Sequence, residues 1–270
     1  MDTNHRAFDA VLFDLGATLI YFNGPWPETV AAQHRVLAED LIARGYQLDA
    51  PRFAADFAAR LNAYYIERET EFIEQSTEWI LRALLSDYGY PDAPGSDLRA
   101  ALDAMYGVTQ KIWTLEEDAM PTIRQLRAQG YRLGLISNAN DDKDVETLID
   151  IHGLRPWFDV ILISAAFGRR KPDPRIFHAA LQALEVPPAR AVMVGDTLGA
   201  DVLGAKNSGM AGVWITRRAS APGNRAHADT IQPDAVIDTL SELPDLLYNW
   251  PSNSGRAASL TSRRSGQNPP

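Results

Sequence analysis

Cysteine is absent from the 270 residues of this chain. Disulfide bonds, thiolate metal sites and a cysteine nucleophile are therefore excluded. Histidine is sparse, and its five copies are scattered without the short spacings that a metal site requires. We therefore expect packing or surface roles for the histidines, which are His5, His34, His152, His178 and His227.

Basic residues are outnumbered, with 26 Lys and Arg against 35 Asp and Glu and a formal net charge of −9. A dominant nucleic-acid surface needs a concentrated basic face, so we expect no nucleic-acid partner. No apolar run approaches the ~20 residues that cross a bilayer. The opening residues MDTNHRAFDAVLF lack a basic segment followed by a long apolar one. We expect a cytoplasmic protein without membrane contact.

The first half of the chain changes from a strand pattern to a helical one. Residues 10–15, AVLFDL, form a short apolar run typical of a buried strand. From about 27 to 112 the pattern predicts four helices, which start at Pro27, near Pro51, and after the N-caps Ser76 and Ser96. Apolar residues recur at helical spacing in the last three helices, and we expect them to form a helix-bundle core. They are Phe53, Phe57, Leu61 and Tyr64; Trp79, Ile80, Ala83 and Leu84; and Leu98, Leu102, Met105 and Tyr106.

From about residue 118, strand patterns alternate with helical ones of about ten residues. The strands are YRLGLIS, FDVILIS, AVMVGD and AGVWIT, which indicates βαβ units around a parallel sheet. The predicted fold class is α/β, with a Rossmann-like doubly wound core and an inserted all-helical cap domain. We expect the core at residues 8–18 and 115–248, the cap at 22–112, and a disordered polar tail at 250–270.

Polar residues follow several of the predicted strands at their carboxyl ends, where ligands bind in open α/β sheets. Taken singly, each suits a turn, a helix cap or a solvated loop. Together they form a set in which carboxylates converge and favour a Mg²⁺ ion, while a lysine and a hydroxyl supply donors for a phosphate. The set comprises Asp14, Ser137, Asn138, Lys171, Asp196 and Asp201.

These residues lie in four ordered motifs, FDLGATL, LISN, GRRKPDPRIF and VGDTLGADVLGAKNSGM. In this order the motifs resemble those of the haloacid dehalogenase-like hydrolase superfamily, in the type with a helical cap after the first strand. The resemblance covers about residues 8 to 240. It implies Mg²⁺-dependent hydrolysis of a small phosphorylated metabolite, a phosphate monoester, in a site over which the cap closes.

The resemblance also implies a role for each matching position. Asp14 would be the nucleophile that forms an aspartyl-phosphate, and Lys171 would neutralise Asp14 and the phosphate. Thr18 and Ser137 would hold phosphate oxygens or orient Asp14, and Asn138 would lie with them at the phosphate. The Mg²⁺ ligands would be Asp14, Asp196, Asp201 and the main-chain carbonyl of Gly16.

Gly16 departs from the family pattern. Family phosphatases have a second aspartate there, which protonates the leaving oxygen and later activates water. A general acid–base group contributes typically ~10²- to 10⁴-fold to a rate. One explanation is a slower phosphatase, restricted to activated leaving groups or using another acid, such as Glu28. Another is a weak or inactive phosphoryl-ligand-binding or interaction protein on the same scaffold.

Two further explanations involve hydrolysis of a carbon–halogen or a carbon–phosphorus bond instead of a phosphate ester. Family dehalogenases work without metal and lack the paired acids of the fourth motif, so Asp196 and Asp201 argue against a dehalogenase. Phosphonoacetaldehyde hydrolase also lacks the second aspartate but needs a cap lysine, and the only lysine near the predicted cap is Lys111 at its far edge.

Two other groups of residues have competing interpretations. The arginines Arg169, Arg170, Arg217 and Arg218 are expected in solvated loops rather than at an anion site. The segment FNGPWPE, residues 22–28, is expected either to wall the substrate pocket or to pack the cap onto the core.

Overall fold

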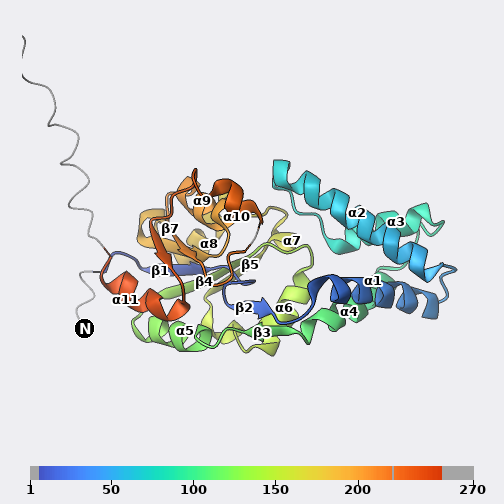
Figure 1. Ribbon diagram of the computed structural model, residues 1–270, viewed down its shortest axis with the longest axis horizontal. Coiled ribbons are helices and arrows are strands. Elements are labelled where there is room, and N and C mark those ends of the chain that lie inside the picture. The colour runs from blue at the N-terminus through green and yellow to red at the C-terminus, as the bar shows by residue number, and fades with distance from the viewer. Residues whose placement is uncertain (1–5, 221, 251–270) are drawn as a thin grey trace, which may run out of the picture.

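The computed structural model describes residues 6–220 and 222–250, so the predicted tail lies outside the described residues except for Trp250. A parallel sheet of six strands, in the order β5-β4-β1-β6-β7-β8, forms the centre of the larger part of the molecule (Figure 1). The predicted α/β class and doubly wound sheet are therefore confirmed. The strands are β1 (Ala10–Phe13), β4 (Arg132–Ser137), β5 (Val160–Ile163), β6 (Ala191–Gly195), β7 (Ala211–Ile215) and β8 (Ala235–Ile237).

Strand β1 is fully buried because it pairs with β4 on one side and β6 on the other. Its side chains alternate between two hydrophobic clusters, as the period of two in a strand requires. Val11 and Phe13 belong to the cluster under α5 (Ala119–Ala128), α6 (Asp142–Ile151) and α11 (Leu243–Tyr248). Ala10 and Leu12 belong to the cluster under α8 (Pro174–Leu184) and α9 (Leu203–Asn207). Helices thus cover both faces of the sheet, and β1 ends at its centre.

The helices around the sheet are α5 (Ala119–Ala128), α6 (Asp142–Ile151), α7 (Ser164–Phe167), α8 (Pro174–Leu184), α9 (Leu203–Asn207), α10 (Pro222–His227) and α11 (Leu243–Tyr248). The 3₁₀ turns η2 (Arg155–Trp157), η3 (Pro188–Arg190) and η5 (Leu240–Glu242) and the π-helical turn η4 (Leu198–Val202) complete this part. Among the described residues, no helix has both the length and the apolar character needed to cross a membrane.

Four helices form a separate bundle, here called the helical insertion (Figure 1). They are α1 (Trp26–Ala43), α2 (Ala50–Glu71), α3 (Thr77–Asp87) and α4 (Gly95–Gln110). The bundle has its own hydrophobic core, which contains the predicted apolar face of α2: Phe53, Phe57, Leu61 and Tyr64. The boundaries predicted for a cap, residues 22–112, remain a prediction.

In the insertion, one predicted helix cap is confirmed, and one predicted cap and one predicted core residue are wrong. Ser76 caps α3 as predicted, accepting a hydrogen bond from the Trp79 amide. Helix α4 starts at Gly95 after Pro94, so Ser96 is not its cap. Trp79 is 55% exposed rather than part of the core. Residue 79 lies outside the buried stripe of α3, which has helical spacing. The stripe consists of Thr77, Ile80, Leu81, Leu84 and Leu85.

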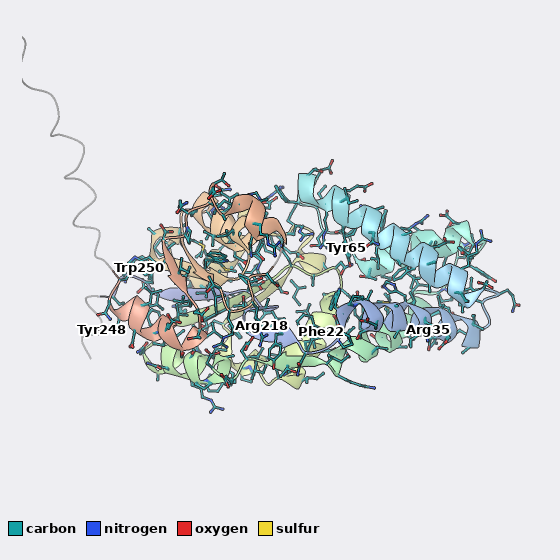
Figure 2. The ribbon with its side chains drawn as sticks, viewed as in Figure 1. Phe22, Arg35, Tyr65, Arg218, Tyr248 and Trp250 are labelled. Atoms are coloured by element: carbon teal, nitrogen blue, oxygen red, sulfur yellow. The ribbon has the colours of Figure 1, made fainter. Side chains whose placement is uncertain are left out.

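A two-stranded antiparallel ribbon that the sequence analysis missed joins the two parts of the molecule. It consists of β2 (Ile20–Phe22) and β3 (Trp113–Leu115), through which the chain leaves and re-enters the sheet region. The ring of Phe22 packs edge-on against those of Trp26 and Trp113, with centroids 4.8 and 5.6 Å apart, at the junction visible in Figure 2. The aromatic residues of the segment 22–28 therefore pack the insertion against the ribbon.

The insertion also contacts α7, which follows β5, and the loop after it. The amide of Glu74 donates to the carbonyl of Gly168, and the amide of Arg170 donates to that of Phe72. The buried Glu74 carboxylate accepts hydrogen bonds from Tyr64 Oη at 2.6 Å and Ser164 Oγ at 2.7 Å. Arg170 lies 3.8 Å from this carboxylate and is buried, so it is not in a solvated loop as expected.

Glu74→Ala tests this contact. Removing a buried carboxylate leaves its hydrogen-bond donors and nearby arginines uncompensated, and we expect the free energy of unfolding to fall by about 3 kcal/mol or more. Glu78→Ala is the matched control, since Glu78 forms an exposed pair with Arg82 one turn along α3 and its loss costs about 0.5 kcal/mol or less. Urea denaturation measures both values. Equal losses in the two variants would contradict the role of Glu74.

Candidate active site

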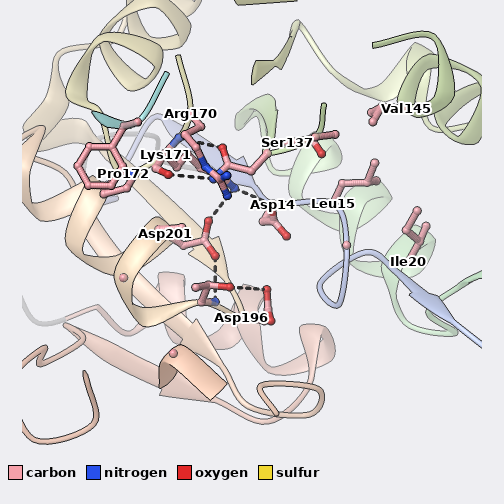
Figure 3. Close-up of a pocket in the computed structure, with 18 of the residues that line it drawn as sticks. Asp14, Leu15, Ile20, Ser137, Val145, Arg170, Lys171, Pro172, Asp196 and Asp201 are labelled. Atoms are coloured by element: carbon pink, nitrogen blue, oxygen red, sulfur yellow. Dashed lines mark hydrogen bonds and ion pairs between the residues drawn. The ribbon is translucent and has the colours of Figure 1, made fainter. Parts of the chain in front are cut away.

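A cavity of about 630 Å³ lies at the carboxyl ends of β1, β4 and β6, next to the helical insertion. Figure 3 shows that most of the predicted site residues gather there. The lining includes Asp14, Gly16, Ser137, Asn138, Lys171, Asp196 and Asp201, which come from motifs far apart in the sequence. The sheet brings them together because its central parallel strands end at the same edge.

Lys171 is the centre of this group. Its side chain is 1% exposed, and its Nζ donates to Asp14 Oδ1 at 2.6 Å, Asp201 Oδ1 at 2.7 Å and the Ile136 carbonyl at 2.7 Å. These three acceptors satisfy all three N–H groups of the ammonium. Burial alone lowers the pKa of Lys171, but the Asp14 and Asp201 carboxylates outweigh it and raise the pKa, so the lysine is charged.

Three carboxylates surround this lysine. Asp14, Asp196 and Asp201 are buried and each offers an oxygen within 4.8 Å of the others. Burial raises the pKa of Asp14, although Lys171 opposes the shift, and burial together with the charges of Asp14 and Asp201 raises the pKa of Asp196. One ammonium does not balance three carboxylates. An all-oxygen donor set with two excess negative charges fits a divalent hard cation such as Mg²⁺.

Two side chains bind the main-chain carbonyl of Asp196 and hold this residue in place at the end of β6. Its carbonyl accepts hydrogen bonds from Trp214 Nε1 and Asn224 Nδ2, both at 2.8 Å. Asn224 also accepts from the Leu198 amide at 2.8 Å, so it bridges the two ends of the turn. The sequence analysis missed both residues, because an apolar strand and a polar loop carry no signal for such a contact.

Asp201 lies in the π-helical turn η4, where its Oδ2 accepts a hydrogen bond from the Thr197 amide at 3.0 Å. Gly195 makes this approach to β6 possible. A Cβ atom at residue 195 would lie well under 3.0 Å from the Asp201 carboxyl group, closer than real Cβ atoms come to such atoms. Gly195, the first glycine of the fourth motif, is therefore required by the position of Asp201.

Three further predicted residues, Ser137, Asn138 and Thr18, differ in their hydrogen bonds and in their place relative to the cavity. Ser137 is buried at the end of β4 and lines the cavity. Asn138 also lines it, but its amide is engaged with the Lys171 main chain: Nδ2 donates to the Lys171 carbonyl at 2.9 Å and Oδ1 accepts from the Lys171 amide at 2.8 Å. Thr18 is 1% exposed, and its hydroxyl has no hydrogen-bond partner among the described residues.

Gly16 lines the cavity without a conformational need for glycine. Its φ lies outside the left-handed region, and an added Cβ would make ordinary contact with the Trp113 ring at 3.8 Å. Glu28 and Lys111 are exposed, and neither is among the described residues that line the cavity. Two residues not expected there, Asp144 and His227, do line it.

Arg217 and Arg218 form ion pairs rather than extending into a solvated loop. Arg217 binds Glu116 Oε2 at 3.0 Å and Asp118 Oδ2 at 2.6 Å, and Arg218 also binds Glu116. These pairs join the chain after β7 to the chain before α5. Of the four arginines considered, Arg170 alone is among the described residues lining the cavity.

Comparison with known proteins gives a consistent family. The model for haloacid dehalogenase-like hydrolases matches residues 8–209. The ribulose-1,5-bisphosphate 5-phosphatase of Halopiger xanaduensis is 33% identical over 245 residues, which cover 88% of this chain and 98% of that protein. The glyceraldehyde 3-phosphate phosphatase of Pyrococcus furiosus is 37% identical over 129 residues, which cover 48% of this chain and about half, 51%, of that protein.

A solved structure of similar architecture is the 2-haloacid dehalogenase of Pseudomonas syringae pv. tomato DC3000. It is 27% identical, covers 90% of this chain and 100% of that chain, and superimposes with a TM-score of 0.67. The chain therefore resembles proteins named for two different reactions.

Gly195→Ala tests the packing that places Asp201. The added methyl group forces the Asp201 carboxylate away from Lys171, and overpacking of this kind costs about 1–3 kcal/mol of stability. Gly107→Ala is the control, because Gly107 lies within α4 with no atom within 4 Å of an added Cβ, and alanine there raises stability by up to about 1 kcal/mol. Urea denaturation gives both values. A Gly195→Ala protein as stable as the wild type would show that Asp201 lies elsewhere.

Proposed function

The chain belongs to the haloacid dehalogenase-like hydrolases, and we propose that it is a phosphatase that hydrolyses a small phosphate monoester through an aspartyl-phosphate on Asp14. The observation that carries this proposal is the buried Lys171 ammonium bound to both Asp14 and Asp201, with Asp196 beside them. A lysine paired with a carboxylate in a cavity supports nucleophilic attack on a group that carries negative charge.

Each residue has a defined task in this reaction. Asp14 attacks phosphorus while Lys171 reduces the repulsion between the carboxylate and the phosphate oxygens. Ser137 donates its hydroxyl to a phosphate oxygen, and Asn138 holds the main chain of Lys171. Thr18, whose buried hydroxyl lacks a partner among the described residues, keeps its expected role of orienting Asp14 or the phosphate.

Asp14, Asp196, Asp201 and the Gly16 carbonyl would hold a Mg²⁺ ion, which supplies charge neutralisation at the phosphate. The named relatives act on small sugar phosphates, and the 630 Å³ cavity suits a substrate of that size. The insertion supplies Phe72 to the cavity wall and the adjoining ribbon supplies Trp113, and both exclude water from the reacting groups.

Two other functions remain as defined alternatives. A binding protein without turnover is favoured by Gly16 alone. A dehalogenase agrees with the similarity to the haloacid enzyme, but the buried group Asp14, Asp196 and Asp201 could hold a cation, for which a metal-independent reaction has no use.

Asp14→Asn separates these functions. We expect the wild type to hydrolyse 4-nitrophenyl phosphate, glyceraldehyde 3-phosphate or ribulose 1,5-bisphosphate with Mg²⁺, and to lose this activity with EDTA. The variant loses at least about 10³-fold in kcat, because it lacks the nucleophile. Asp87→Asn, at an exposed carboxylate of the insertion, is the control with unchanged activity.

Two outcomes would contradict the phosphatase. Calorimetric binding of phosphate esters without any Asp14-dependent turnover would identify a binding protein. Release of halide from a 2-haloacid without metal would identify a dehalogenase.

A further inference from the structure

The cavity contains a carboxylate that the proposed reaction has not used. Asp144 lies in the first turn of α6, lines the cavity together with Val145 and Leu148, and is outside the group of acids around Lys171. Figure 3 places Leu15, Ile20 and Val145 on one side of Asp14, away from Asp196. Asp144 precedes Val145 in the chain and Gly16 follows Leu15, so both line the cavity next to labelled residues of this side.

The contacts of Asp144 leave it available for chemistry. Its Oδ1 accepts a hydrogen bond from Gln110 Nε2 of the insertion at 2.9 Å, and Oδ2 has no protein partner among the described residues. Asp144 is not needed as a helix cap, because Asp141 caps α6 by accepting from the Asp144 amide at 2.9 Å. Asp141 is itself paired with Arg99 at 2.9 Å.

Asp144 is half-buried, and a partly desolvated carboxyl group without its own cation costs stability when it is ionised. Burial raises the pKa of Asp144 to about 7; the Gln110 hydrogen bond opposes this shift, Asp141 reinforces it, and Arg99 opposes it. Near neutral pH such a group is divided between its protonated and ionised forms, as an acid and base in one catalytic cycle must be. Costly titratable groups of this kind in a cavity are typical of functional sites.

We propose that Asp144 supplies the general acid and base that Gly16 cannot, acting on the leaving oxygen and on water directly or through one bridging water. This inference rests on the proposed phosphatase function. It assigns the missing proton transfer to the helix after β4, instead of to the residue two positions after the nucleophile.

The proton balance closes over the two steps. First, an Asp14 oxygen bonds to phosphorus, the bond from phosphorus to the ester oxygen breaks, and protonated Asp144 gives its proton to that oxygen. The Asp144 carboxylate then takes a proton from water as the water oxygen attacks the aspartyl-phosphate. The bond between Asp14 and phosphorus breaks, inorganic phosphate leaves, and Asp144 is protonated again.

His227 is the rival donor among the described cavity residues. It is exposed at the end of α10, and its ring lies beside Gly199 in the turn that carries Asp201, within 3.5 Å of a Cβ added there. That position is beside the turn that carries Asp201, on the side where the proposed cation would bind.

Asp144→Asn is assayed with Mg²⁺ on an aryl ester, 4-nitrophenyl phosphate, and on an alkyl ester, glycerol phosphate. An alkoxide needs a proton to leave and a nitrophenolate does not, so we expect kcat/KM to fall by about 10²-fold or more for the alkyl ester and less than about 10-fold for the aryl ester. The second step also slows, and a burst of nitrophenolate appears. Asp142→Asn, on the same helix but outside the cavity lining, leaves both substrates unchanged.

A rescue and a stability measurement exclude a merely structural effect. Gly16→Asp introduces the carboxyl group of the family pattern at a position where an added Cβ makes only ordinary contact, and in the Asp144→Asn background it restores alkyl-ester hydrolysis. The pKa of Asp144 is raised in the folded state, so wild-type stability falls as pH rises from about 4 to about 7. We therefore expect the difference in Tm, Asp144→Asn minus wild type, to be larger at pH 8 than at pH 5.

Several results would overturn the proposal. If Asp14-dependent hydrolysis is present but Asp144→Asn leaves the ratio of alkyl to aryl rates unchanged, Asp144 is not the acid and the phosphatase stands. A selective loss in His227→Gln instead would identify that residue as the donor. Absence of Asp14-dependent turnover in the wild type would overturn both the phosphatase and this inference.

Discussion

The buried ammonium of Lys171 is the interaction on which the site depends. It contacts a carboxylate from the end of β1, a carbonyl from β4 and a carboxylate from the turn after β6. A buried charge is stable only when its partners are in place, so these three strands must end at the same point for the lysine to be tolerated. The Asn138 side-chain amide also binds both the amide and the carbonyl of Lys171. Because Asn138 directly follows β4, this strand holds the lysine through a second contact.

The helical insertion is connected to this constraint through the loop that carries Lys171. Residues 72–74 pair with residues 168–170, and the Glu74 carboxylate binds Ser164 next to β5. Arg170, the neighbour of the lysine, lies against the same carboxylate. Movement of the insertion would therefore strain the segment that positions Lys171.

The two sides of the cavity have different chemistry. The side with Asp196 and Asp201 is dense in charge and suits a cation and a phosphate, whereas the side with Gly16 is lined by Trp113, Ile20 and other apolar groups. An apolar wall raises the pKa of any carboxyl group placed in it, as burial does for Asp144. Gly16 adds no carboxylate to this side of the cavity, and Asp144 is the lining carboxyl group whose pKa burial raises to about 7.

The sequence by itself determined the strand and helix alternation and the apolar face of α2, because these follow from local periodicity. It also identified Asp14, Ser137 and Asp196 at strand ends and Lys171 and Asp201 in the segments that follow β5 and β6, because polar residues there come after apolar runs. The sequence analysis placed Trp79 in the core, but the packing of α3 leaves it exposed. It also placed the start of α4 after Ser96, but the helix starts at Gly95, directly after Pro94.

Only the tertiary structure revealed the ribbon of β2 and β3, the burial of Arg170, and the presence of Asn224 and Asp144 at the site. Asp144 lies in the run DDKD, which reads as an ordinary helix start, and its special setting arises from the insertion and α6 packing around it. Local patterns specify which residues are available, and the long-range contacts decide which of them are buried together.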